Sequence, residues 1–399
     1  MKILHYIDDF DFSLGGVVQY VFQSSRAMAE HGVDVTLVAG RNKDIPETWF
    51  DPNSNKTPNA VVLNNSPGPY GWLNGRQVEE VLSIARQHDV VHFHCPWDLG
   101  ANRVAKQLLK RNIPYVISTH GTLDTWSVNH KWLKKIVYLR LIAKHFLRRA
   151  AIVHCTALSE REQVSHNVRK LDNSVCVVPY ISLAKSTPSR DGEKSIYDQF
   201  PDISKSKTKL LFMSRVHVKK GLELLFDAIA ILKNKGAEIQ LLVAGPGEEK
   251  YIQSLVDRAR RLGIHEDVLF LGMVRGALKS NLFHESDLFV LTTQQENFGI
   301  VLVEAMAFGL PIVTTRGTDI YKELEGGGAI ITGFSPAEVA DSLARLVNDS
   351  EDRARRGELG KAFVREWLDE SKVISQHEEM YKQAIAKATH RTEALQTND

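Results

Sequence analysis

Two short apolar segments flank a long apolar helix pattern in the last third of the chain. Residues 287–293 (DLFVLTT) and 311–315 (PIVTT) each predict a short buried parallel strand, because both are apolar and lie beside polar turns. The pattern between them predicts a helix that begins near Phe298 and ends at Gly309, with Pro311 as a stop signal. This order of elements indicates an α/β protein.

Two carboxylates and a helix start coincide at this strand-to-helix junction. Glu296 lies in the loop, and Glu304 lies about two turns into the predicted helix. The backbone N–H groups of Phe298, Gly299 and Ile300 would point into the crevice above the strand ends, where anions bind. The simpler interpretation is that Glu296 is a solvated loop residue and Glu304 an exposed helix residue. We favour a ligand with hydroxyls and phosphates, because the residues around Glu304 are apolar and a buried lone carboxylate is costly.

Two cations flank another predicted strand-to-helix turn. Residues 209–215 (KLLFMSR) predict a strand that ends in Arg215, and Lys220 precedes a helical pattern over 222–233. An arginine and a lysine in these positions suit a diphosphate, whose charge needs neutralising as it leaves. Ion-paired surface residues are the alternative.

The segment E-x-F-G-x-x-x-x-E-A-x-A-x-G, followed by a proline and a strand, resembles the signature of family 4 glycosyltransferases. The segment R-x-x-x-x-K-G at residues 215–221 is also similar to that family. The family consists of retaining, nucleotide-sugar-dependent enzymes, and the resemblance extends over essentially the whole chain. It implies the GT-B fold, in which two Rossmann-like doubly wound α/β domains face a central cleft. We expect an acceptor-side domain at 1–185, a nucleotide-sugar-binding domain at 186–365, and a helix with a tail at 366–399 that crosses back, with helix over 367–381.

The resemblance also implies roles for the residues of the second half. Glu296 would hold the hydroxyls of the donor sugar as a catalytic residue, and Glu304 would hold the ribose hydroxyls. The donor diphosphate would be bound by Arg215, Lys220 and the backbone of residues 298–300. Met273 and Val274, at the end of the segment 268–274, would lie near the nucleobase.

The first half begins with a β-α-β pattern. A strand over 1–7, a turn over 13–16, a helical pattern over 17–31 and a strand over 33–38 follow one another. The motif G-x-G-x-x-G is missing and no acidic residue follows the second strand, so a dinucleotide cofactor is disfavoured and we predict no cofactor. The family resemblance implies a nucleotide-sugar, which is a co-substrate. By resemblance, Gly16 would offer its N–H to the donor diphosphate. Residues 9–11 (DFD) fall in the predicted first loop as loop acids or acceptor contacts, and we predict no required metal.

Histidines end two later strands. His92 and His94 share one face of the segment 89–94, where lining of an acceptor cleft and plain packing are both open. His120 ends the strand 115–119, and the family resemblance makes it a catalytic residue that orients the transferred sugar. Stacking on an acceptor sugar and ordinary aromatic packing remain open for further candidates, which are Trp72, Trp97, Asp124 and Trp126.

Composition limits the partners and the compartment. A net charge of +2 over 399 residues provides no polyanion-binding excess, so we expect no nucleic acid partner. Three widely spaced cysteines and the lack of a bilayer-spanning apolar run predict a cytoplasmic protein. Residues 131–149 form a basic amphipathic pattern. A core-packed helix is favoured there, and peripheral contact with the inner face of a membrane stays open.

We therefore expect a retaining, metal-independent glycosyltransferase. It would move a sugar from a nucleotide-sugar donor to a glycan or lipid-linked acceptor in polysaccharide or glycolipid biosynthesis. The alternatives are a non-catalytic nucleotide-sugar-binding or scaffold protein, and a GT-B epimerase or phosphorylase.

Overall fold

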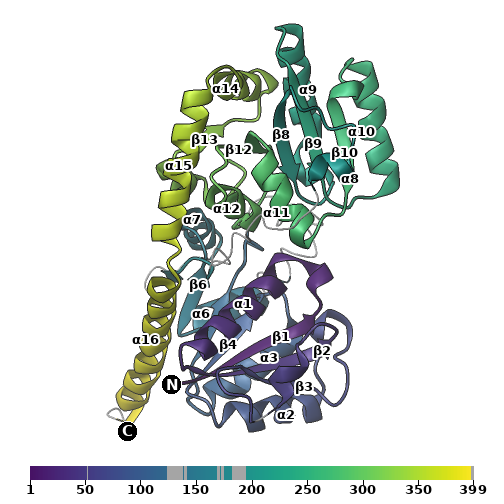
Figure 1. Cartoon of the computed structure of the whole chain (residues 1–399). Coiled ribbons are helices and arrows are strands. Elements are labelled where there is room, and N and C mark those ends of the chain that lie inside the picture. Colours follow the sequence, from purple (N-terminus) through teal and green to yellow (C-terminus); the bar gives the residue numbers. More distant parts are fainter. Residues whose placement is uncertain are drawn as a thin grey trace. The chain divides into compact units, whose positions relative to one another are not determined.

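The computed structural model describes residues 1–51, 53–123, 138, 142–168, 171, 175–181 and 195–396. The chain divides into two compact units (Figure 1). The first unit consists of Met1–Ser182 with Leu368–Asp399, and the second unit of Leu183–Trp367. Among the described residues, no helix combines the length and the apolar character that a bilayer crossing requires.

The described part of the first unit contains a seven-stranded sheet with the order β3-β2-β1-β4-β5-β6-β7. All its neighbouring strands are parallel. The order reverses between β1 and β4, so the connections from these two strands leave the sheet in opposite directions and open a crevice at their carboxyl ends. The strands are β1 (Lys2–Phe10), β2 (Asp34–Asn42), β3 (Asn59–Val62), β4 (Val90–His94), β5 (Tyr115–Ser118), β6 (Ile152–Cys155) and β7 (Val175–Val177).

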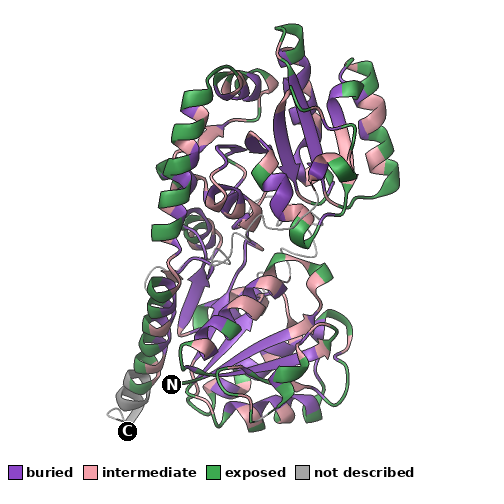
Figure 2. Cartoon of the chain, viewed as in Figure 1, coloured by how far each residue is buried: buried purple, intermediate pink, exposed green. Residues whose placement is uncertain are grey.

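Helices cover both faces of this sheet, and its inner strands are mostly buried, whereas the outermost strands β3 and β7 are only partly buried (Figure 2). Side chains alternate along β1, so Leu4 and Tyr6 belong to one core cluster and Ile3 to the other. The cluster with Tyr6 includes residues of α2, α3 and α6, and the cluster with Ile3 includes residues of α1 and α16. The helices among the described residues of this unit are α1 (Gly16–Glu30), α2 (Gly75–Ala85), α3 (Leu99–Leu109), α6 (Lys144–Arg149), α7 (Leu158–Asn167) and α16 (Glu370–Gln396), with 3-10 turns η1 (Phe12–Leu14), η2 (Glu47–Phe50) and η3 (Pro69–Gly71).

The described part of the second unit contains a six-stranded sheet with the order β10-β9-β8-β11-β12-β13. Its strands are also parallel, and the order reverses between β8 and β11. The strands are β8 (Thr208–Met213), β9 (Ile239–Ala244), β10 (Val268–Gly272), β11 (Leu288–Leu291), β12 (Ile312–Thr315) and β13 (Ile330–Thr332). The helices are α8 (Ile196–Gln199), α9 (Leu222–Asn234), α10 (Glu249–Arg261), α11 (Gly276–Glu285), α12 (Ile300–Ala307), α13 (Tyr321–Gly326), α14 (Pro336–Asn348) and α15 (Ser350–Trp367), with 3-10 turns η5 (Val218–Lys220) and η6 (His265–Asp267).

Several sequence-based boundaries were wrong, and two of them concern the first unit. The predicted strand 1–7 continues to Phe10, because it pairs with β2 as far as Asn42, so Asp9 belongs to the strand and not to the first loop. Only Asp11 lies beyond the strand, where its side chain caps η1 by accepting from the backbone N of Ser13 at 2.7 Å. The predicted helix 367–381 is the start of α16, which begins at Glu370 after α15 has ended at Trp367.

Candidate functional site

The cation and carboxylate motifs of the second unit follow the two strands at which its sheet order reverses. Residues 214–221 follow β8, and residues 292–299 follow β11. In open parallel sheets, ligands bind in the crevice at the carboxyl ends of such strands. The topology therefore places both predicted motifs at the preferred ligand position of this sheet.

Backbone contacts hold these two loops together. The N–H of Gln294 donates to the carbonyl oxygen of Lys219 at 2.7 Å, and the hydroxyl of Thr292 donates to the carbonyl oxygen of Gly221 at 2.8 Å. Gly221 has a left-handed φ of 69°, and a Cβ there would lie 2.0 Å from the carbonyl oxygen of Thr292. The close approach of the loops therefore explains why a glycine follows Lys220.

Lys220 and Glu296 meet across this junction. The ammonium of Lys220 is hydrogen-bonded to the carboxylate of Glu296 in an ion pair. Lys220 is only 9% exposed, and a cation with so little hydration needs such a partner. The backbone of Glu296 is held by the loop after β12, since its N–H donates to Gly317 at 2.8 Å and its carbonyl accepts from Asp319 at 2.9 Å.

Arg215 also follows β8, but unlike Lys220 it has no carboxylate partner among the described residues. It is exposed, and no described residue forms an ion pair with its guanidinium. Lys220 therefore comes with a carboxylate partner, while Arg215 keeps its five donors available for an anionic ligand.

The helix after Glu296 begins later than the sequence suggested. It was predicted to begin near Phe298, but α12 begins at Ile300 because Gly299 adopts a left-handed φ of 63° as its N-cap. Phe298 is buried and stacks on Trp367, with ring centroids 5.6 Å apart. A Cβ on Gly299 would lie 2.9 Å from Leu302 Cδ1, so this position also favours glycine. The first N–H groups of α12 have no intrahelical acceptor and favour an anion at this end.

Glu304 has a partner that the sequence analysis missed. The ammonium of Lys279, on α11, donates to both carboxylate oxygens of Glu304 at 2.6 and 2.7 Å. Glu304 is partly exposed and not buried as expected, and its counter-charge comes from the protein. A lysine on a helix is normally solvated, so nothing local distinguished Lys279.

The two predicted nucleobase neighbours differ in exposure. Met273 and Val274 follow β10 at the edge of the sheet, two strands away from β8. Met273 is 53% exposed, whereas Val274 is 7% exposed. Met273 can therefore offer its side chain to a flat apolar ligand, and Val274 only its backbone.

The predicted residues of the first unit lie at the carboxyl ends of its strands. Gly16 is the first residue of α1, and a Cβ there would meet no atom within 4 Å, so local packing does not require a glycine. His120 has a left-handed φ of 46°, which is unusual for a residue with a side chain. Its Nε2 lies 3.2 Å from His94 Nδ1, and its Nδ1 lies 3.2 Å from the hydroxyl of Tyr180.

Comparison with known proteins identifies the family. The profile described as Glycosyl transferases group 1 matches residues 193–363, and the profile described as Glycosyltransferase Family 4 matches residues 14–180. The chain belongs to the family 4 glycosyltransferases. The fold predicted from its sequence, two α/β Rossmann-like halves of the GT-B type, is confirmed.

Two relatives and one solved structure show how this glycosyltransferase compares with other members. It is 25% identical to N-acetyl-alpha-D-glucosaminyl L-malate synthase of Bacillus anthracis, over 92% of this chain and 94% of that protein. It is 27% identical to phosphatidyl-myo-inositol mannosyltransferase of Mycobacterium tuberculosis, over 92% of this chain and 93% of that protein. The crystal structure of Anabaena HepE in complex with UDP and glucose aligns with a TM-score of 0.75 at 19% identity, covering 96% of this chain and 99% of that one.

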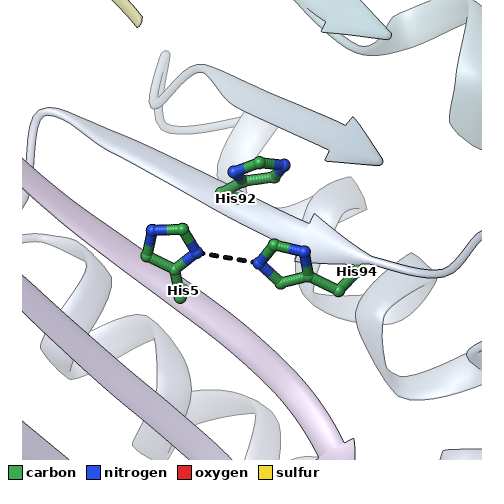
Figure 3. Close-up of side chains that lie close together, drawn as sticks. All are labelled: His5, His92 and His94. Carbon is green, nitrogen blue, oxygen red and sulfur yellow. Dashed lines mark hydrogen bonds between the residues drawn. The ribbon is translucent and has the colours of Figure 1, made fainter. Parts of the chain in front are cut away.

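The glycosyltransferase has a cluster of buried histidines on one face of its first sheet. Figure 3 shows His5 on β1 and His92 and His94 on β4, with His5 Nδ1 2.8 Å from His94 Nε2. His92 lies between the hydroxyls of Tyr381 and Ser118, each at 2.7 Å. Three further members share this layer, namely His120, His154 and His377.

The sequence is compatible with two interpretations of His92 and His94, lining of an acceptor cleft and plain packing. Their exposures of 0% and 5% agree better with packing. The ligand atoms of His5, His92 and His94 lie within 4.8 Å of one another, which is close enough for one metal ion. Both ring nitrogens of His92 and His94 are already hydrogen-bonded, however, and only His5 Nε2 has no partner. A metal ion would have to break most of these bonds, so the geometry favours a polar core.

The remaining acceptor candidates separate into described and undescribed residues. Trp72 is 47% exposed, and the guanidinium of Arg103 lies 4.4 Å from its ring centroid. Trp97 packs against Tyr138 with centroids 5.5 Å apart. Asp124 and Trp126 lie outside the described residues, as does most of the amphipathic pattern at 131–149. In its described end, α6, Phe146 and Leu147 are buried and the basic residues 148 and 149 are exposed.

Proposed function

We propose that this glycosyltransferase moves a sugar from a nucleotide-sugar donor to a glycan or lipid-linked acceptor, with retention of anomeric configuration and without a metal ion. The observation that carries this proposal is the contact between Lys220 and Glu296, beside Arg215 and the start of α12, at the crevice of the second sheet. A cation, a carboxylate and a helix start at one place suit a ligand with a phosphate end and a hydroxyl end.

The chemistry of the leaving group explains why cations belong there. Departure of a nucleoside diphosphate concentrates negative charge on its outer phosphate, and fixed donors stabilise that charge most when they are already in place. Arg215 would approach the phosphates from its exposed position, and Lys220 would share its ammonium between Glu296 and the diphosphate. These residues would supply the charge that a metal ion supplies in other transferases.

The carboxylates would bind the two sugar parts of the donor. Glu296 is partly exposed with a fixed backbone, which suits a residue that orients the hydroxyls of the transferred sugar. Glu304 would accept from the ribose hydroxyls while Lys279 balances its charge. For the first unit we carry forward the roles implied by the family, namely Gly16 for the diphosphate and His120 for the transferred sugar.

The comparisons guide the choice of donor and acceptor for testing. The aligned Anabaena structure contains UDP and glucose, so uridine diphosphate sugars are the first donors to try. The relatives are named for malate and for phosphatidyl-inositol, which makes a small molecule or a lipid head group a reasonable acceptor class. The thiols of Cys95, Cys155 and Cys176 agree with our proposal that the enzyme works in the reducing cytoplasm.

The deciding experiment is a turnover assay with a panel of uridine, guanosine and adenosine diphosphate sugars in the presence of EDTA. Thermal-shift screening first selects the nucleotide that raises the melting temperature. We expect slow hydrolysis of the donor when no acceptor is present. With an acceptor, NMR should show that the new glycosidic bond has the same anomeric configuration as the donor. Binding without any turnover would favour a nucleotide-sugar-binding or scaffold protein instead. Loss of all turnover in EDTA with rescue by a divalent cation would contradict the metal-independent mechanism.

A further inference from the structure

We propose that Glu160 is a positioning residue of the reaction, because its buried carboxylate fixes the turn that carries His120. This inference rests on the proposed function, in which His120 orients the transferred sugar. It concerns two segments of the first unit. Residues 119–122 form the turn directly after β5, and Glu160 lies in the first turn of α7.

The turn that carries His120 has a backbone conformation that few residues with side chains adopt. His120 has a φ of 46° and Gly121 a φ of 65°, so two consecutive residues are left-handed. The N–H of Thr122 donates to the carbonyl oxygen of Thr119 at 3.0 Å and closes the turn around them. Positive φ at both central residues is typical of a type I′ turn, where glycine, asparagine and aspartate are usual. A histidine keeps this conformation only where surrounding contacts enforce it.

One carboxylate oxygen of Glu160 supplies such contacts on both sides of His120. Its Oε1 accepts from the hydroxyl of Thr119 at 2.6 Å and from the backbone N–H of Gly121, also at 2.6 Å. Thr119 and Gly121 are the residues directly before and after His120. A single oxygen therefore holds both neighbours of the histidine.

The other carboxylate oxygen is anchored on the next strand of the sheet. Oε2 of Glu160 accepts from the backbone N–H of Thr156 at 2.6 Å and from its hydroxyl at 2.9 Å. Thr156 follows β6, which pairs with β5, so the carboxylate ties together the loops after two neighbouring strands. Glu160 is only 1% exposed, and a carboxylate with so little hydration needs donors of this kind.

The imidazole of His120 depends on where this turn lies. Its two ring nitrogens contact His94 and Tyr180, each at 3.2 Å. Both distances are at the long end of the hydrogen-bond range, so a small displacement of the turn would break these contacts. A misplacement of about 1 Å in a group that orients the substrate can reduce the rate about 100-fold. Glu160 would thus act on the reaction through the position of His120.

The first test is Glu160→Gln. Glutamine has the same length, but its amide nitrogen cannot accept a hydrogen bond, so the donors on one side lose their acceptor. With UDP-glucose, or the diphosphate sugar that the panel selects, we expect kcat to fall at least about tenfold while the KM for the donor changes less than about twofold. Glu162→Gln, at an exposed position of the same helix, is the control and should keep the wild-type kcat. Wild-type kcat in Glu160→Gln would overturn the proposal.

A double-mutant cycle separates positioning from a general loss of stability. His120→Asn removes the imidazole but leaves a residue that tolerates the left-handed conformation, and it should lower kcat at least about tenfold. In that background, adding Glu160→Gln should change kcat less than about twofold, because no imidazole remains to be positioned. An equal reduction by Glu160→Gln in both backgrounds would assign the carboxylate to stability alone and overturn the inference, as would wild-type kcat in His120→Asn.

Thr119 provides a second test that does not depend on the folding of Glu160→Gln. Thr119→Val removes one of the four donors to Glu160 and keeps the shape of the side chain, so three donors still satisfy the carboxylate. We expect Thr119→Val to lower kcat about fivefold, and Thr119→Ser, which restores the hydroxyl, to stay within about twofold of wild type. Equal kcat in the valine and serine variants would contradict the role of this contact.

The outcomes distinguish this inference from the proposed function. Turnover that stays at the wild-type rate in Glu160→Gln and Thr119→Val overturns the inference and leaves the proposed function intact. No turnover of any donor by the wild type overturns the proposed function. In that case NMR of protein with ¹⁵N-labelled histidine still tests the turn, with His120→Asn assigning the signal. A His120 signal that shifts in Glu160→Gln supports the positioning by Glu160, and an unchanged signal contradicts it.

Discussion

The ammonium of Lys220 binds the carboxylate of Glu296, although 76 positions separate the two residues in sequence. Each residue lies in one of the two loops at the reversal of the second sheet, and backbone hydrogen bonds hold the two loops together. The pair therefore presents one positive and one negative group in a fixed arrangement.

Removing either partner of this pair should impair transfer. We expect Lys220→Ala and Glu296→Gln each to lower kcat/KM at least about tenfold, because each removes a contact to the donor and leaves its partner unpaired. Lys219→Ala is the matched control, since it removes a neighbouring ammonium that contacts Gln295 instead. The prediction is contradicted when Lys219→Ala is as impaired as Lys220→Ala, or when either site variant keeps full activity.

Lys279 should act on donor binding through Glu304. We expect Lys279→Met to raise the KM for the donor several-fold with a smaller change in kcat, because a carboxylate without its bidentate partner loses its orientation. Steady-state kinetics with varied donor concentration measure the effect. Lys250→Met, on the exposed surface of α10, is the control and should behave as wild type. An unchanged KM in Lys279→Met would show that the pair is only structural.

The first unit should lose stability in mild acid. Burial lowers the pKa of His5, His120 and His377 to about 3 and that of His154 to about 4, and it lowers the pKa of His92 and His94 well below the usual value of 6.5. The folded state therefore keeps these rings neutral, whereas the unfolded chain binds protons as the pH falls below about 6.5. The contribution of the neutral histidines to the free energy of unfolding is therefore complete above about pH 6.5 and is lost as the pH falls toward 4.

Urea denaturation at pH 7.5 and pH 5.5 measures this loss. Each histidine contributes up to about 1.4 kcal/mol per pH unit, so the six together give a steep dependence. Asp98 and Asp8 oppose them, because burial raises the pKa of both carboxyls, that of Asp98 to about 7, and the folded state then binds protons more readily. These are two groups against six histidines. His92→Asn should reduce the pH slope by about one proton. A first unit that is equally stable at both pH values would contradict the prediction.

The two glycines near the ends of α9 should differ in their tolerance of a side chain. Gly221 and Gly236 have similar positive φ angles of 69° and 82°, but a Cβ on Gly221 would lie 2.0 Å from the Thr292 carbonyl and one on Gly236 would meet nothing within 4 Å. We expect Gly236→Ala to cost about 1 kcal/mol of unfolding free energy, from backbone strain alone. Gly221→Ala should cost about 3 kcal/mol or more, since the two loops must separate. Equal costs, measured by thermal or urea unfolding, would show that the loops move apart easily.

Much of the architecture followed from local patterns. Apolar strands alternating with helical periodicity predicted the α/β class, and the loops after the strands predicted where Arg215, Lys220 and Glu296 lie. The errors occurred at element ends. Gly299 delays the start of α12, and pairing with β2 extends β1 to Phe10, and neither effect is visible in a hydrophobic pattern.

The amino-acid sequence by itself determined the two-sheet fold and the family motifs, because periodicity and turn chemistry act between residues that are near in the chain. Only the tertiary structure decided which distant groups meet, since strand order brings together segments with no local relationship. The tertiary structure paired Lys279 with Glu304, and it brought Tyr381 of α16 into hydrogen-bond contact with His92 in the histidine layer. These contacts depend on how the strands and helices of each unit pack together, which no single segment of the chain encodes.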